Sequence, residues 1–204
     1  ALHPVPSHKL KFTIYRELFK AQSADAAALE AMWRSVPEAE RQSPEIALEA
    51  ARLFNESDAE LGRLAAEAIE AALQQSPAAW DDSSLRLLDE YARAQMLSPR
   101  DQLERVEAWL KAAPPTGPIR AGLLRAAGLI CLRQQLWGKS KGYLLESLAA
   151  DRDASTLLAL ARLADAIGDE REAAAYFKDA AIAFAKTSTS MADSPSAVWR
   201  TAQR

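Results

Sequence analysis

Apolar residues along this chain recur at intervals of three and four positions, and no segment alternates strictly between apolar and polar residues. Alanine, leucine, glutamate and arginine dominate, and only seven of the 204 residues are glycine. Both features favour helices, so the sequence predicts an all-α fold without strands. Proline cannot occupy a helix interior, and its positions therefore predict helix ends or loops. Ten prolines divide the chain into pieces the size of a helical hairpin.

The periodic segments predict ten helices arranged as five successive hairpins. Their expected ranges are 9–20 with 24–35, 44–55 with 58–75, 82–94 with 99–112, 119–133 with 137–149, and 154–167 with 170–186. We expect Ser23 and Ser98 to cap the helices that follow them, and Pro44 to lie in a first turn. Gly168 is expected to end its helix in the left-handed conformation.

Large apolar residues predict how these hairpins pack. In the first hairpin, one set of side chains should face another: Phe12, Tyr15, Leu18 and Phe19 against Leu29, Met32 and Trp33. Three tryptophans, Trp80, Trp109 and Trp137, fall near hairpin junctions, where we expect them to wedge between neighbouring hairpins. If Trp137 is fully buried there, its truncation should destabilise the protein by about 3–5 kcal/mol.

A repeat of thirty-three residues links the last two hairpins. Four residues, Gly128, Ser140, Leu144 and Ser147, return in phase as Ala161, Ala173, Phe177 and Ala180. A weaker third copy comprises Ala51, Ala65, Ile69, Ala72 and Pro77. Small side chains let two helix axes approach to about 8–10 Å, so these positions should mark helix crossings. A fixed period of this length is typical of stacked helical repeats.

This spacing of small and large residues resembles the tetratricopeptide repeat (TPR). The resemblance implies an α-α superhelix, a right-handed solenoid of about five TPR-like hairpins, over residues 9–186. Residues 1–8 would form a leader, and residues 187–204 a loose tail or a short terminal helix around Trp199.

In TPR folds the first helix of each hairpin lines a concave face that binds partners. The resemblance therefore places eight residues on a partner-binding face: Glu49, Arg52, Arg125, Leu129, Arg133, Leu158, Arg162 and Asp165. Arginine presents a planar charged fork suited to carboxylate or phosphate groups. The alternative is that these arginines are solvated or paired with neighbouring acidic residues.

A second resemblance rests on the string from Leu132 to Lys139, with Tyr143-Leu144 and Ser147-Leu148 after it, and on Ser98 to Leu110. These segments are similar to the C-terminal region of the bacterial HemY proteins, which are associated with haem biosynthesis. The resemblance implies a protein anchored in the bacterial inner membrane, with this region on the cytoplasmic face. The absence of an initiator methionine fits such a fragment. A flavin enzyme that shares the gene name needs a G-x-G-x-x-G turn, which this sequence lacks.

Composition argues against several classes of function. Basic and acidic residues, 25 and 28 respectively, are interspersed, so nucleic acid is not an expected partner. The two histidines, His3 and His8, have no metal ligand at suitable spacing, and Cys131 lies on an apolar helical face. Paired acids at Asp81-Asp82 and Asp169-Glu170 should compensate helix dipoles. We therefore expect no catalytic residue, no metal and no cofactor.

These observations lead to a working hypothesis and two alternatives. The hypothesis is a non-catalytic scaffold that binds a protein or peptide. One alternative is a haem or porphyrin carrier in which an apolar groove holds the macrocycle, although ligand residues for haem iron are lacking. The other alternative, an all-α enzyme, requires an enclosed pocket with convergent ionisable groups.

Overall fold

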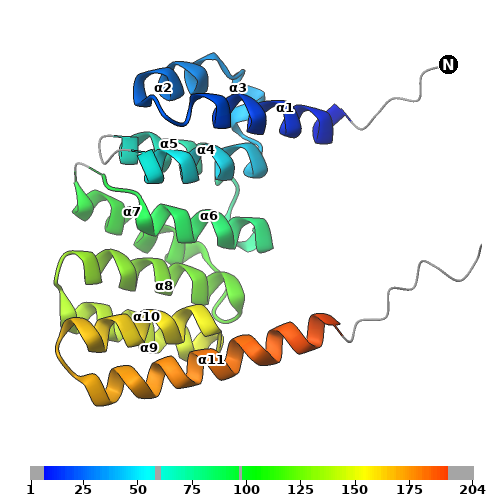
Figure 1. Cartoon of the computed structure of the whole chain (residues 1–204). Coiled ribbons are helices and arrows are strands. Elements are labelled where there is room, and N and C mark those ends of the chain that lie inside the picture. Colours follow the sequence, from blue (N-terminus) through cyan, green and yellow to red (C-terminus); the bar gives the residue numbers. More distant parts are fainter. Residues whose placement is uncertain (1–6, 58–60, 97, 193–204) are drawn as a thin grey trace, which may run out of the picture. The chain divides into compact units, whose positions relative to one another are not determined.

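The computed structural model describes residues 7–57, 61–96 and 98–192, and the side chains of 10–57, 61–96 and 98–186. Every regular element in these ranges is helical, with eleven α-helices and no strand (Figure 1). The predicted all-α class is therefore confirmed. The chain divides into two compact units, Ala1–Asp151 and Arg152–Arg204.

The ten predicted helices are all present. Unit 1 contains α1 (Ser7–Gln22), α2 (Ala26–Ser35), α3 (Glu38–Arg41), α4 (Pro44–Ser57), α5 (Gly62–Ala72), a short 3-10 helix (Pro77–Ala79), α6 (Asp82–Arg93), α7 (Pro99–Ala112), α8 (Pro118–Arg133) and α9 (Trp137–Ala150). Unit 2 contains α10 (Ala154–Ala166) and α11 (Glu170–Ala192). The prediction missed α3, because a single turn is too short to show a helical period.

The two ends of the chain fall only partly within the described ranges. The expected leader was 1–8, but α1 already begins at Ser7, and residues 1–6 lie outside the described part. The predicted tail was to begin at residue 187, yet α11 continues to Ala192, so that boundary was wrong. The terminal helix considered around Trp199 lies outside the described residues.

Three of the four predicted helix signals are confirmed. Pro44 is the first residue of α4, and the Ser98 side chain accepts a hydrogen bond from the backbone N–H of Asp101. Gly168 follows α10 with φ +80°. Ser23 is not a cap, because its hydroxyl donates to the carbonyl oxygen of Lys20. Instead, the carboxylate of Asp25 accepts from two backbone N–H groups at the start of α2.

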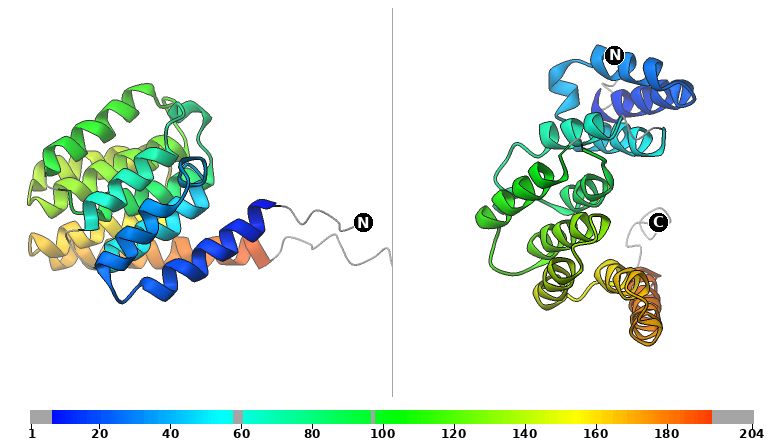
Figure 2. Two further views of the ribbon diagram at one scale, coloured as in Figure 1. Left: turned by 90° about the horizontal axis from the view of Figure 1, so that it is seen from above. Right: turned by 90° about the vertical axis from the view of Figure 1, so that its left-hand side faces the viewer.

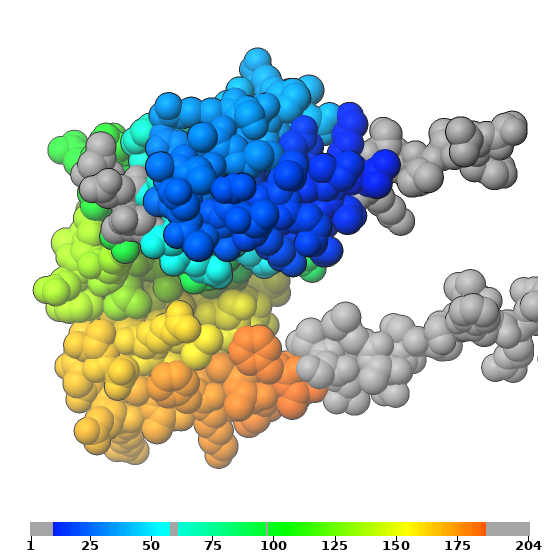
Figure 3. All heavy atoms as spheres, turned by 45° about the horizontal axis from the view of Figure 1, so that its top comes forward, coloured from blue at the N-terminus to red at the C-terminus, as the bar shows by residue number. Residues whose placement is uncertain are grey.

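The helices of unit 1 form two layers. α1, α4, α6 and α8 each pack against the next, while α5 packs against α6 and α7 against α8 (Figure 2). We call α1, α4, α6 and α8 the first-helix layer, because each begins a hairpin. In the space-filling view the atoms of α1 to α3 lie directly on those of α4 and α5 (Figure 3). Each hairpin of unit 1 therefore buries its apolar face against a neighbouring hairpin of that unit.

Aromatic side chains fill the core of the first hairpins. The Phe19 ring lies 6.2 Å from that of Trp33, and Trp33 lies 6.1 Å from Phe54 on α4. Phe19, Leu29 and Trp33 are buried as predicted. Leu18 was expected in this set but is 41% exposed, because the face of α1 that carries Phe12, Tyr15 and Phe19 turns it outward.

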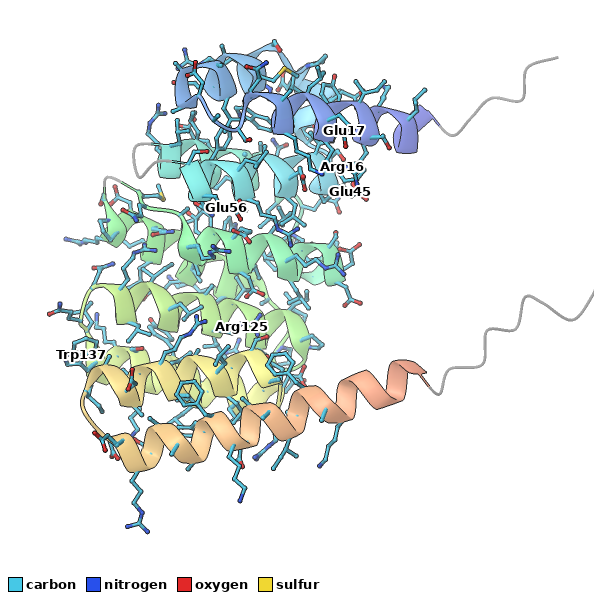
Figure 4. The ribbon with its side chains drawn as sticks, in the orientation of Figure 1. Arg16, Glu17, Glu45, Glu56, Arg125 and Trp137 are labelled. Atoms are coloured by element: carbon cyan, nitrogen blue, oxygen red, sulfur yellow. The ribbon has the colours of Figure 1, made fainter. Side chains whose placement is uncertain are left out.

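A second aromatic cluster lies between the second and third hairpins. The ring centroid of Trp109 on α7 is 5.5 Å from that of Trp80 and 5.1 Å from that of Tyr91 on α6. Trp80 and Trp109 are half-buried at this junction, as expected. Trp137 was wrongly expected to be buried: it is 36% exposed and is the first residue of α9 (Figure 4). It lies one turn before Ser140, the first buried residue of that helix, so the large loss of stability expected for its truncation does not apply.

The crossing of α8 and α9 uses the small residues that the repeat predicted. Gly128 lies against Leu144, and a Cβ atom added to Gly128 would fall 2.7 Å from Leu144 Cδ2. Ser140 Oγ donates to the Gly128 carbonyl at 2.9 Å, and Ser147 Oγ donates to that of Ala121 at 2.8 Å. These bonds satisfy buried hydroxyls while keeping the two helices close.

Unit 2 repeats this crossing with alanines. Ala161, Ala173 and Ala180 are buried between α10 and α11, as predicted. Phe177 was expected to fill the groove as Leu144 does, but it is 44% exposed. The position equivalent to Gly128 is Ala161, so this hairpin has a methyl group at the position where Gly128 leaves room for Leu144 in the preceding hairpin.

Candidate partner-binding surface

The outer face of α4 is a row of charged residues. Its core face consists of buried apolar residues, which are Ile46, Ala47, Ala50, Ala51 and Phe54. On the opposite side, Glu45, Arg52 and Glu56 are exposed and Glu49 is half-buried. Spacings of three and four residues place these four side chains on one face of the helix. Figure 4 shows Glu45 and Glu56 on this helix.

α6 continues the charged row in the same layer. Its buried residues include Leu87, Leu88 and Tyr91. The positions opposite to them are charged, namely Asp82, Arg86, Asp89 and Arg93, and all four are exposed or half-buried. We call the eight charged residues of α4 and α6 the first-helix stripe: Glu45, Glu49, Arg52, Glu56, Asp82, Arg86, Asp89 and Arg93.

A buried carboxylate fixes α6 against α4 beneath the stripe. Glu90 is only 6% exposed. The Asn55 amide donates at 3.1 Å both to the Glu90 carboxylate and to its backbone carbonyl. Arg93 donates to the same carboxylate at 3.3 Å, and Arg52 forms an ion pair with it at 3.6 Å. A buried charge needs such partners, so these contacts hold the two helices in one register.

Arg125 connects α8 to the stripe. The side chain is buried, and its Nε and Nη2 atoms donate to Asp89 Oδ1 at 3.1 and 2.7 Å (Figure 4). Both bonds are charge-assisted, which makes them stronger than neutral hydrogen bonds. Leu129, one turn further along α8, is half-buried. Of the two interpretations of the arginines, pairing with an acidic neighbour therefore applies to Arg125.

Arg133 has a structural role at the end of α8. Its guanidinium donates to the Ala92 carbonyl and to Gln102 Oε1, each at 2.6 Å. The Gln102 amide in turn donates to the Tyr91 carbonyl. Burial of the guanidinium lowers the pKa of Arg133, although much of the rest of the side chain is exposed. These bonds tie the ends of α6 and α7 to α8.

The three remaining predicted residues belong to unit 2. Arg162 and Asp165 are exposed on α10, and Leu158 is half-buried. Their spacing of four and three residues places them on one face of this helix. The structure thus groups the predicted residues into Glu49 and Arg52 on α4, three residues on α8, and three on α10.

The sequence prediction missed the contribution of α6. The third hairpin departs from the repeat pattern, so no residue of α6 was aligned to a partner-binding position. The available signal was the spacing of charged residues, since Asp82, Arg86, Asp89 and Arg93 follow each other by four, three and four positions opposite an apolar face.

The described residues do not form a recognisable metal centre. Within them, no three His, Cys, Asp or Glu side chains come together in a group that could hold a metal ion. His3 lies outside the described residues, as does the side chain of His8. Cys131 is buried as predicted, and burial raises the pKa of its thiol. No helix in the described ranges is both long and apolar enough to cross a membrane.

No protein-family model, curated protein or solved structure matches the chain.

Proposed function

We propose that this chain is a non-catalytic TPR-like scaffold whose first-helix stripe binds a protein or peptide partner. The observation that supports this proposal is that eight charged side chains lie on the outer faces of the adjacent helices α4 and α6. The apolar faces of both helices are buried in the core. A partner chain that crosses both helices would meet three carboxylates and one arginine on α4, and two carboxylates and two arginines on α6. Charge complementarity of this kind favours specificity and fast association.

Rigidity of the supporting helices favours the same function. Asn55 and Arg52 of α4 bind Glu90 of α6 and so hold these two helices together, and the Arg125–Asp89 pair joins α8 to α6. Side chains presented from such fixed helices lose less conformational freedom on binding than side chains on loops. In unit 2, Leu158, Arg162 and Asp165 form a separate candidate partner-binding face on α10.

From the resemblance to HemY proteins, we further propose that this scaffold acts in haem biosynthesis. On this proposal the partner is a protein of that process, and the full-length protein is held at the cytoplasmic face of the bacterial inner membrane. The support is the Gln135–Lys139 string, in which Leu136 and Trp137 are exposed and thus accessible to a partner.

Affinity capture with charge variants tests the proposal. The double variant Glu49→Lys with Glu56→Lys reverses two carboxylates of the stripe. Its matched control, Glu67→Lys with Glu104→Lys, makes the same change in net charge on exposed carboxylates of α5 and α7. We expect a specific partner to be retained by the wild type and the control, and to bind the stripe variant about tenfold more weakly.

Thermal unfolding followed by circular dichroism verifies that both variants fold. A partner that is lost equally from both variants would count against the stripe, because the loss would then follow net charge alone. A partner that is retained equally by both variants would remove the basis of the proposal.

A further inference from the structure

A recess on unit 1, away from the first-helix stripe, lies between α7 and the start of α8. Its volume is about 460 Å³, and it is lined by Glu107, Leu110, Lys111, Ala113, Pro115 and Arg120. None of these residues is fully buried, so the recess is open to solvent. An open recess can receive the end of a chain, whereas small-molecule sites usually enclose most of the ligand.

Two cations in the recess lack an acidic partner of their own. Arg120 is half-buried and Lys111 is exposed, and within the described residues neither makes an ion pair or a side-chain hydrogen bond. Arg120 lies in the first turn of α8, which contains no acidic residue. Both side chains are thus available to an anionic ligand, and the planar guanidinium of Arg120 can donate two hydrogen bonds to one carboxylate.

Glu107, the acidic residue that lines the recess, already has a hydrogen-bond partner. Glu107 Oε1 accepts a hydrogen bond of 2.6 Å from the Tyr143 hydroxyl of α9. Burial and this carboxylate together raise the pKa of Tyr143, so the phenol stays protonated and keeps donating to Glu107 at neutral pH. Counted over the residues that line the recess, Glu107 contributes one negative charge beside the two cations, which leaves an excess of one positive charge.

Charge and surface together define the ligand. A single excess positive charge fits a monovalent carboxylate better than a phosphate dianion, which Glu107 would repel. Leu110, Ala113 and Pro115 supply an apolar surface next to the cations. We infer that this recess binds the C-terminal carboxylate of a peptide whose last side chain is apolar, with Arg120 and Lys111 contacting the carboxylate and Leu110 the side chain. The site is independent of the first-helix stripe.

Fluorescence anisotropy with a short, neutral, labelled peptide that ends in leucine tests the inference. The free acid should bind about tenfold more tightly than the same peptide with an amidated C-terminus, because amidation removes the charge. Arg120→Gln should weaken binding of the acid about tenfold and leave binding of the amide unchanged. Lys178→Gln on α11, which removes an exposed lysine elsewhere, should have no effect.

Backbone amide NMR locates the binding. The acid peptide should shift the resonances of Leu110 and Ala113, while inorganic phosphate at the same concentration should not. Equal affinity for acid and amide peptides, equal affinity of the Arg120→Gln and Lys178→Gln variants, or phosphate shifts as large as those of the peptide would each overturn the inference. Because the first-helix stripe variants leave this recess intact, failure here does not bear on the proposed scaffold function.

Discussion

Single polar side chains decide where the helices of this protein begin. The carboxylates of Asp25, Asp81 and Asp153 each accept hydrogen bonds from two backbone N–H groups at a helix start. The sequence predicted a helix start at Asp81-Asp82. For α2 it predicted Ser23 as the capping residue, whereas Asp25 caps that helix. Both Ser23 and Asp25 are good capping residues, so composition alone could not choose between them. The chain continues for two residues beyond Ser23 before α2 begins, so Asp25 is the residue that lies at the cap position.

Removal of the Asp81 cap should destabilise the protein in a pH-dependent way. Asp81→Ala should lower the free energy of unfolding by about 1 kcal/mol at neutral pH, since two N–H groups of α6 lose their acceptor. The Ser83 hydroxyl, which donates to the carboxylate, is the largest cause of a lowered pKa for Asp81. A lowered pKa in the folded state means that this stabilisation is present above the unfolded pKa of about 3.9 and is lost as the pH falls through the folded value.

Urea unfolding at neutral and at acid pH measures this effect. The difference between wild type and Asp81→Ala should shrink as the pH drops below about 4. Asp82→Ala, one residue further along, removes an exposed first-turn acid without removing the cap and should cost less. Equal losses for the two variants, or a loss for Asp81→Ala that does not change with pH, would show that the side chain is not acting as a cap.

Between elements, the size of the residue at a crossing determines how close two helices come. Gly128, Ser140 and Ser147 were predicted at the α8–α9 crossing from their recurrence, and they occupy it. Phe177 and Trp137 were predicted to be buried and are not. Periodicity identifies the face of a helix that packs, but it does not reveal how far the neighbouring helix extends or how much space its side chains leave. Ala161 recurs in phase with Gly128, but the recurrence does not show whether a large residue fits beside it.

Two glycine substitutions separate helix packing from helix propensity. Gly142→Ala on α9 should stabilise the protein by up to about 1 kcal/mol, because a Cβ atom there meets nothing within 4 Å. Gly128→Ala gains the same propensity but forces its methyl group to within 2.7 Å of the buried Leu144, so we expect a net loss of about 1–2 kcal/mol. Chemical denaturation of both variants gives the two values. Stabilisation by Gly128→Ala would mean that the crossing is looser than described.

At the scale of the whole molecule, the order of hairpins in unit 1 creates a surface that no single hairpin has. The resemblance to TPR hairpins predicted Glu49 and Arg52 on a partner-binding face; both lie among the outward charged residues of α4, and their binding role stays a prediction. Sequence reasoning did not predict that Asp89 joins Arg125, or that Glu90 lies buried among Asn55, Arg52 and Arg93. Except for Glu90–Arg93, which lie one turn apart on α6, these pairs join residues more than thirty positions apart, and such contacts depend on which helices become neighbours.

Carboxyl footprinting of the chain with and without its captured partner tests the binding surface most directly. Carbodiimide labelling followed by mass spectrometry reports the accessibility of each acidic side chain. Binding at the first-helix stripe predicts that labelling of Glu49 and Glu56 falls several-fold in the complex, while Glu67 on α5 and Glu104 on α7 stay unchanged. Protection confined to Glu67 and Glu104, or no protection at Glu49 and Glu56 under saturating partner, would contradict the assignment.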